Sequence, residues 1–168
     1  MPPIKHYEAT IKTFRLSLAP LLASHAPDMF AILSDRQLYS FTGDEPPESP
    51  AALEERYRYL ESRKSPDESQ LWLNWLVTLE HNKTPTGYVQ ATVSESHADI
   101  AWVIGLQWQG SGYASEAANA IVKWLQENGV KAIRCCIHPN HTVSQRVASN
   151  AGFNKSSTVE DGEDVWLL

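Results

Sequence analysis

Three strand-like segments follow one another between Gln70 and Gly105, and this run most constrains how the chain can fold. The first segment is almost continuously apolar (QLWLNWLVTLEHN), and the turn sequence KTPTG leads from it into the second (YVQATV), in which apolar residues alternate with polar or amphipathic ones. Two such segments joined by a short turn predict an antiparallel hairpin. The third segment (IAWVIG) follows SESHAD and ends just before a glycine-rich stretch.

Helical periodicity is found on both sides of these strands. The predicted helices are PDMFAILSD, residues 50–63 after an N-cap at Ser49, the stretch after the glycines up to Gly129, and residues 142–150. Further strands are predicted in TFRLSLAPL, where Phe14, Leu16 and Leu18 alternate, in KAIRCCIH, and in a final hairpin, GFNKSSTVEDGEDVWLL. This order of elements indicates an α/β (α+β) fold with a mixed, mainly antiparallel sheet and helices on both faces.

Length and charge narrow the class of protein. The chain has 168 residues, which favours one domain over residues 1–168. Its net charge of -6 leaves no broad basic surface, so nucleic acid is not an expected partner. We expect neither a signal peptide nor a membrane span, and we expect a cytoplasmic location. Cys135 and Cys136 are neighbours in a predicted strand and point to opposite faces, so no disulfide joins them in this interpretation.

The sequence Gly110-Ser111-Gly112 lies at a predicted strand-to-helix junction. A glycine-rich entry to a helix lets phosphate oxygens approach free backbone N–H groups, although the glycines alone also fit a tight turn. The Lys-Ser/Thr pair of a P-loop does not follow, and neither the third glycine nor the acidic residue of a dinucleotide-binding fingerprint is present. What remains is a pyrophosphate site at a helix N-terminus, with Gln107 as a side-chain donor.

Three segments resemble the GNAT superfamily of N-acetyltransferases. Residues 107–112 match the family's Gln/Arg-x-x-Gly-x-Gly/Ala loop, and residues 113–117 resemble the helix opening that follows it. The stretch HPNHTVSQRVASNAGF resembles the family's second CoA-contacting segment. The N-terminal part is similar to the branch that contains ribosomal-protein N-terminal (alanine/serine) acetyltransferases. The resemblance implies a GNAT-like sheet, acetyl-CoA as cosubstrate and a primary amine as acceptor.

The resemblance also assigns residues to the CoA site. It places the pantetheine arm along the end of the third strand, the pyrophosphate on the glycine loop, and further CoA contacts in the second segment. The implied CoA-binding residues are Trp102, Val103, Ile104, Gln107, Gln109, Gly110, Ser111, Gly112, Tyr113, Ala114, Asn140 and Ser144.

Acetyl transfer to an amine also needs groups that move protons. We hypothesise that Glu95 is the general base, with Asp99 and Glu80 as other carboxylates near turns, although each also fits a solvated turn charge. The family's usual acid, a tyrosine four residues before the Gly-Phe pair, is replaced by Ala148. Ser144, one helical turn earlier, is the candidate acid, and a role limited to binding CoA or the local backbone stays open.

Several alternatives remain at this point. His138 and His141 downstream of the two cysteines match no closed four-ligand zinc pattern, so no metal is expected. The acceptor is either a protein N-terminal amine or a small-molecule amine. A CoA-binding module without turnover and a nucleotide-phosphate binder are the rival functions. The sequence leaves monomer and homodimer undecided.

Overall fold

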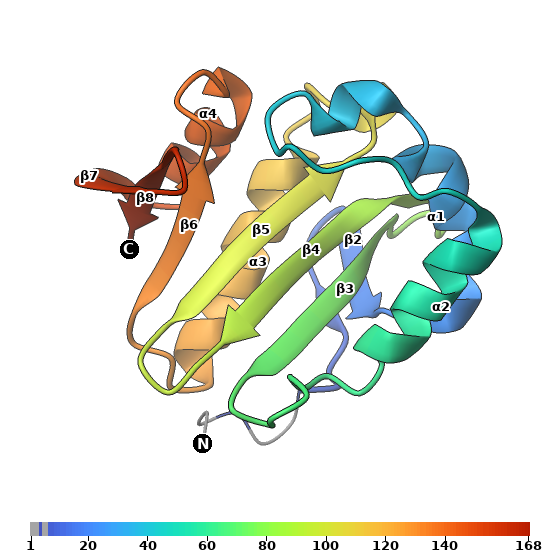
Figure 1. Cartoon of the computed structure of the whole chain (residues 1–168), viewed down its shortest axis with the longest axis horizontal. Helices are drawn as coiled ribbons and strands as arrows, with labels where there is room; N and C mark the ends of the chain where they lie inside the picture. Colours follow the sequence, from blue (N-terminus) through green and yellow to red (C-terminus); the bar gives the residue numbers. More distant parts are fainter. Residues whose placement is uncertain (1–3, 5–6) are drawn as a thin grey trace.

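The computed structural model describes residue 4 and residues 7–168, and within them eight strands form one sheet (Figure 1). The expectation of no signal peptide concerns the N-terminal stretch, of which residues 1–3 and 5–6 lie outside the described residues. The strands lie in the order β1-β2-β3-β4-β5-β6-β8-β7. Their bounds are β1 Ile11–Lys12, β2 Leu16–Pro20, β3 Leu71–Leu79, β4 Pro85–Val93, β5 Ala98–Ile104, β6 Ile133–Ile137, β7 Asn154–Glu160 and β8 Glu163–Leu167.

Neighbouring strands in this sheet run antiparallel, except β5 and β6, which run parallel. The three consecutive strands of the sequence form its centre, with Leu73 opposite Ala91 and Gln90 opposite Ala101. The final hairpin enters the sheet through β8, which pairs with β6. The predicted mixed, mainly antiparallel sheet is therefore confirmed.

Helices cover both faces of the sheet, as the sequence predicts. In Figure 1, α1 and α2 lie on one face and α3 on the other, and α4 packs against α3 and β6. Their bounds are α1 Ala26–Leu33, α2 Pro50–Leu60, α3 Tyr113–Glu127 and α4 Thr142–Asn150, and the short 3-10 helices are η1 Ala23–His25, η2 Arg36–Tyr39 and η3 Leu106–Trp108. In the described part of the chain, no helix has the length and apolar character needed to cross a bilayer.

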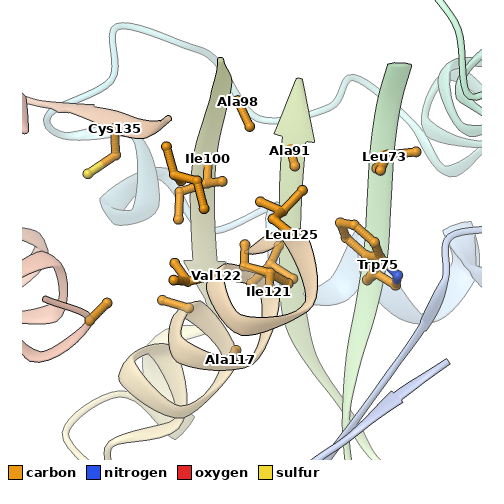
Figure 2. Packing of buried hydrophobic residues seen from close by; sticks show 14 of the residues in the cluster. Leu73, Trp75, Ala91, Ala98, Ile100, Ala117, Ile121, Val122, Leu125 and Cys135 are labelled. Atoms are coloured by element: carbon orange, nitrogen blue, oxygen red, sulfur yellow. The ribbon is translucent and has the colours of Figure 1, made fainter. Parts of the chain in front are cut away.

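The main core lies between α3 and the centre of the sheet (Figure 2). One stripe of α3 is buried because its apolar residues recur at helical spacing. It consists of Ala117, Ala118, Ile121, Val122 and Leu125. These side chains meet alternate residues of the strands, among them Leu73, Trp75 and Ile100. A second core cluster joins α1 and α2 to the other face, where Leu53 and Tyr57 are buried with Leu76.

Two sequence expectations are wrong in detail. Alternation predicts a strand that includes Phe14, but β2 begins at Leu16 and Phe14 is 96% exposed. The reason is a tight turn, which is closed where the Thr13 N–H donates to the Leu16 carbonyl at 2.9 Å. Helix α2 begins as predicted, with the Ser49 Oγ accepting from a backbone N–H at 3.1 Å, but it ends before Arg63, whose φ of 57° is not helical.

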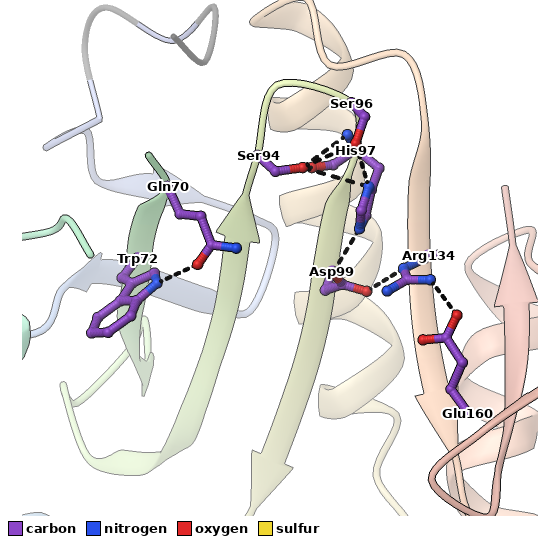
Figure 3. Close-up of polar contacts among 8 residues, drawn as sticks. All are labelled: Gln70, Trp72, Ser94, Ser96, His97, Asp99, Arg134 and Glu160. Carbon is purple, nitrogen blue, oxygen red and sulfur yellow. Dashed lines mark hydrogen bonds and ion pairs between the residues drawn. The ribbon is translucent and has the colours of Figure 1, made fainter. Parts of the chain in front are cut away.

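Strands β5 and β6 separate from each other soon after they begin. Within the described residues they pair only through Ala98 with Ile133 and Asp99 with Arg134. Arg134 holds this paired end together, because its Nε donates to Asp99 Oδ1 at 2.5 Å and its Nη1 donates to Glu160 Oε1 at 2.8 Å (Figure 3). Beyond these pairs the strands diverge toward their C-terminal ends, and the sheet opens between them.

Candidate active site

A cavity of about 520 Å³ fills the opening between β5 and β6. Successive residues of both strands line it, such as Ile100 with Ala101 and Cys135 with Cys136, and successive strand residues point to opposite faces of a sheet. The cavity therefore reaches both faces. The glycine loop and the start of α3 line it where β5 ends, and His138 and Glu163 line it where β6 ends, with Phe41 beside His138.

The glycine loop has the conformation for which its glycines are needed. Gly110 has φ of 78° and Gly112 has φ of 82°, in the left-handed region that other residues rarely adopt. Gly112 is the N-cap of α3, and its carbonyl accepts from the Glu116 N–H at 3.0 Å. The N–H groups of the first turn of α3 have no acceptor inside the helix, so this end of the cavity presents backbone donors and the positive end of the helix dipole.

Arg15, a residue that no sequence pattern singles out, approaches the same loop and does not line the cavity. Its Nη1 donates to the Ser111 carbonyl at 2.9 Å, and its Nε forms an ion pair with Glu116 at 2.6 Å. The guanidinium also lies over the ring of Tyr113, 4.6 Å from the centroid. No pattern within the loop identifies this residue, because Arg15 precedes Ser111 by 96 positions.

Most of the predicted CoA-binding residues line the cavity. These are Trp102, Val103, Ile104, Gln109, Gly110, Gly112, Tyr113, Ala114 and Ser144. Gln109 also fixes the strand end, since its Nε2 donates to the Ile104 carbonyl at 2.8 Å. The structure does not bring Gln107, Ser111 and Asn140 to the cavity wall: all three are exposed, and the Asn140 N–H donates to His138 Nδ1 at 3.1 Å.

Glu95 is not among the residues that line this cavity. It is exposed in the turn between β4 and β5, at the opposite end of β5 from the glycine loop. Because β5 has seven residues and a strand rises about 3.3 Å per residue, roughly 20 Å separates the two ends. The other carboxylates considered with it are engaged elsewhere, since Asp99 binds Arg134 and Glu80 binds Lys83. The structure therefore leaves the hypothesis that Glu95 is the base without geometric support.

Glu163 is the carboxylate that the cavity does contain. It starts β8, where the pairing of Ile137 with Asp164 places it at the end of β6 beside His138. Burial raises the pKa of Glu163 above its ordinary value, His138 opposes this change, and the negative charges of Asp161 and Asp44 add to it. A carboxylate with a raised pKa in a cavity is a typical proton acceptor in catalysis.

Ser144 lines the cavity from α4, and its Oγ lies 3.4 Å from His141 Nε2. Burial, with a smaller contribution from His138, lowers the pKa of His141, so the ring is neutral at neutral pH and its Nε2 can accept a hydrogen bond. Phe41 stacks on His141 with ring centroids 4.5 Å apart. Ala148, the position at which the resemblance would place a tyrosine, is fully buried in the main core.

The two cysteines are free and lie on opposite faces, as expected. Burial raises the pKa of Cys135 to about 12. The pKa of Cys136, which also lines the cavity, is raised mainly by burial, with Arg134 opposing the effect. Both side chains are therefore thiols at neutral pH, and the nucleophilic thiolate is scarce. Across the described ranges, no group of three or more His, Cys, Asp or Glu side chains is arranged to hold a metal ion.

Comparison with known proteins finds one matching family model, described as an acetyltransferase (GNAT) domain, over residues 15–154. No curated protein sequence matches the chain. Among solved structures, a GNAT-family acetyltransferase from Bacillus anthracis is similar with a TM-score of 0.77 and 19% identity, covering 95% of this chain and 96% of the other.

Two other solved structures have names that describe an acceptor. A candidate ribosomal-protein-serine acetyltransferase from Vibrio cholerae has a TM-score of 0.74 and 19% identity, covering 100% of this chain and 99% of the other. An aminoglycoside acetyltransferase in complex with coenzyme A has a TM-score of 0.73 and 20% identity, covering 90% and 92%.

Proposed function

Because the chain belongs to the acetyltransferase (GNAT) family, we propose that the cavity between β5 and β6 transfers an acetyl group from acetyl-CoA to a primary amine. The chain is an acetyl-CoA-dependent acetyltransferase with acetyl-CoA as cosubstrate. One observation supports the location of the site: one cavity reaches both faces of the sheet, with helix N–H donors where β5 ends and a carboxylate where β6 ends. Two substrates can meet there from opposite faces.

The end at α3 fits the CoA pyrophosphate. The left-handed glycines keep side chains out of the loop, and the first turn of α3 offers N–H donors. Arg146 lines the cavity one turn before Asn150, whose Nδ2 donates to Ser115 Oγ at 3.1 Å and so ties α4 to the start of α3. The end of β5, which has no pairing with β6, would lie along the pantetheine arm, and a backbone N–H there would polarise the thioester carbonyl.

The opposite end fits an amine. An amine must be neutral to attack, and Glu163 is placed to take its proton. The amine nitrogen would then bond to the thioester carbon, the C–S bond would break, and its electron pair would go to sulfur. The nitrogen would release its second proton as the amide forms, and Ser144, on the α4 side, would pass a proton to the thiolate directly or through water and regain the one released from nitrogen. A thiol pKa near about 8.5 already makes sulfur a tolerable leaving group, so this donation would contribute less than the base.

For the acceptor we propose a protein N-terminal amine, with a small-molecule amine as the alternative. Support for the first comes from the sequence similarity of the N-terminal part and from the Vibrio cholerae structure, whose match covers 100% of this chain. Support for the second comes from the aminoglycoside acetyltransferase structure. Fold alone does not fix the acceptor, and a cytoplasmic location stays an expectation.

The test is incubation of the protein with acetyl-CoA and a panel of N-terminal peptides, an aminoglycoside and polyamines, followed by free-thiol detection and mass spectrometry. We expect one acetylated amine for each thiol released. Binding of acetyl-CoA without any acetylated product would favour a non-catalytic CoA-binding module. Stabilisation by ATP or NAD but not by CoA would favour a nucleotide-phosphate binder.

A further inference from the structure

The loop that carries Gly110 and Gly112 is hydrogen-bonded to the N-terminal part of the chain through Arg15. Arg15, in the turn that connects β1 to β2, binds both the loop and the first turn of α3. It does not line the cavity, whereas the two glycines do. Arg15 therefore contacts the face of the loop opposite the face that would meet the phosphates.

The contact with Ser111 fixes the direction of one peptide unit. A trans peptide is planar, so its carbonyl and its N–H point in opposite directions. The Ser111 carbonyl points outward to Arg15 Nη1, 2.9 Å away, and the Gly112 N–H of the same peptide must therefore point inward. Among the described residues, no acceptor is found for the Gly112 N–H. This contact directs a free donor into the cavity.

Glu116 anchors the arginine. Its Oε2 accepts from Arg15 Nε at 2.6 Å, and its Oε1 accepts from the Arg15 backbone N–H at 2.9 Å and from Thr13 Oγ1 at 2.6 Å. Burial raises the pKa of Glu116, but the hydrogen bonds from Thr13 and Arg15 outweigh burial and lower the pKa below its ordinary value. The Tyr113 ring supports the other side of the guanidinium. We call these four residues, Thr13, Arg15, Tyr113 and Glu116, the Arg15 clasp.

We propose that Arg15 is a positioning residue that holds the Ser111–Gly112 peptide in the orientation that binds the CoA pyrophosphate. This inference rests on the proposed placement of the pyrophosphate at the glycine loop. The charge of Arg15 is paired with Glu116, so the guanidinium acts by orienting the loop more than by attracting phosphate over a distance. Its planar fork can bind Ser111 and Glu116 together, which a lysine ammonium cannot do in the same geometry.

The experiment compares two acetyl donors in the wild type and in Arg15→Gln. Acetyl-CoA uses the pyrophosphate loop, whereas S-acetylpantetheine lacks both the pyrophosphate and the adenosine. We expect Arg15→Gln to raise the dissociation constant for acetyl-CoA about tenfold or more, because a tenfold change equals about 1.4 kcal/mol and hydrogen bonds to charged groups reach that size. The kcat/KM for S-acetylpantetheine should stay within about twofold of the wild type.

Arg58→Gln is the matched control, because Arg58 forms an exposed ion pair with Glu54 on α2 and does not touch the loop. Arg58→Gln should change neither the dissociation constant for acetyl-CoA nor the kcat/KM for S-acetylpantetheine. Arg15→Lys should behave like Arg15→Gln toward acetyl-CoA, and it takes the place of Arg15→Gln if the glutamine variant does not fold. An equal loss with both donors would mean a merely structural role and would overturn the proposal.

Gly112→Glu separates the failure of this inference from failure of the site assignment. A glutamate at the loop should abolish acetyl-CoA binding, because any side chain strains the left-handed backbone at Gly112 and the added negative charge repels the pyrophosphate. If Gly112→Glu leaves binding intact, the loop is not the phosphate site. If Gly112→Glu abolishes acetyl-CoA binding but Arg15→Gln binds acetyl-CoA and uses S-acetylpantetheine as the wild type does, only the proposed role of Arg15 is wrong.

Discussion

Replacing Gly110 or Gly112 by alanine tests whether the left-handed backbone affects stability and the Arg15 clasp affects acetyl-CoA binding. Gly110 and Gly112 have nearly the same φ, 78° and 82°, so the backbone strain of an alanine is matched. An added Cβ at Gly110 meets nothing within 4 Å, whereas at Gly112 it would lie 3.3 Å from Arg15 Nη2. The pair of variants therefore differs in the contact with the clasp.

The magnitudes follow from the conformation. A non-glycine residue in the left-handed region costs about 1–2 kcal/mol, so both variants should lose that much free energy of unfolding. For a chain of this length, that loss lowers Tm by about 2–8 °C. Gly112→Ala should also push Arg15 away from its partners, so its dissociation constant for acetyl-CoA should rise more than that of Gly110→Ala.

The assay is thermal unfolding without ligand, followed by equilibrium titration with acetyl-CoA. Gly129→Ala is the control for strain, because Gly129 has φ of 87° at the far end of α3. It should lose stability without losing affinity for acetyl-CoA. Wild-type Tm values for Gly110→Ala and Gly112→Ala would refute the conformational reasoning. Equal affinities for acetyl-CoA in all three variants would refute the role of the loop in binding phosphate.

Three further outcomes are expected. Glu163→Gln should lower kcat by about 100-fold or more while the dissociation constant for acetyl-CoA stays nearly constant, and Glu95→Gln should be measured beside it. If Glu95→Gln gives the large loss instead, the base lies at the β4–β5 turn as the sequence first suggested. Ser144→Ala should lower turnover by a factor near the low end of the roughly 100- to 10,000-fold range of acid–base catalysis, and CoA binding should not weaken. Weaker CoA binding with full turnover would make Ser144 a binding residue. Glu116 has a lowered pKa in the folded protein, so its stabilising contribution is present above the ordinary pKa of 4.5 and is lost as the pH falls through the lower folded value. Urea unfolding should therefore separate wild type from Glu116→Gln at neutral pH and bring them together in acid, and a pH-independent difference would contradict the ionised role of Glu116.

Local sequence patterns predicted most of the fold. The helical periodicity of α3 and the Ser49 N-cap of α2 each depend on residues that are close in sequence, and the structure confirms both. The error at Phe14 has a similar local cause. The apolar alternation of Leu16 and Leu18 extends back to Phe14, but Phe14 lies in a turn that is closed by hydrogen bonds between Thr13 and Leu16.

The site was harder to predict where it depends on strand order. Glu163 reaches the cavity because β8 inserts beside β6, and the sequence does not state which strands pair. Arg15 reaches the glycine loop only because the turn before β2 packs against the start of α3. Glu95 was hypothesised as a turn carboxylate near the third strand, and the direction of β5 places it at the end of that strand away from the glycine loop.

The most direct test of the two-ended cavity is the initial rate measured as a function of both acetyl-CoA and the acceptor amine. If both substrates occupy the cavity together, double-reciprocal plots should give intersecting lines, as for direct transfer in a ternary complex. Parallel lines would instead indicate an acetylated enzyme intermediate, with Cys136 in the cavity as the first residue to examine by mass spectrometry. Since burial keeps Cys136 in its thiol form, we expect intersecting lines, and parallel lines would contradict direct transfer.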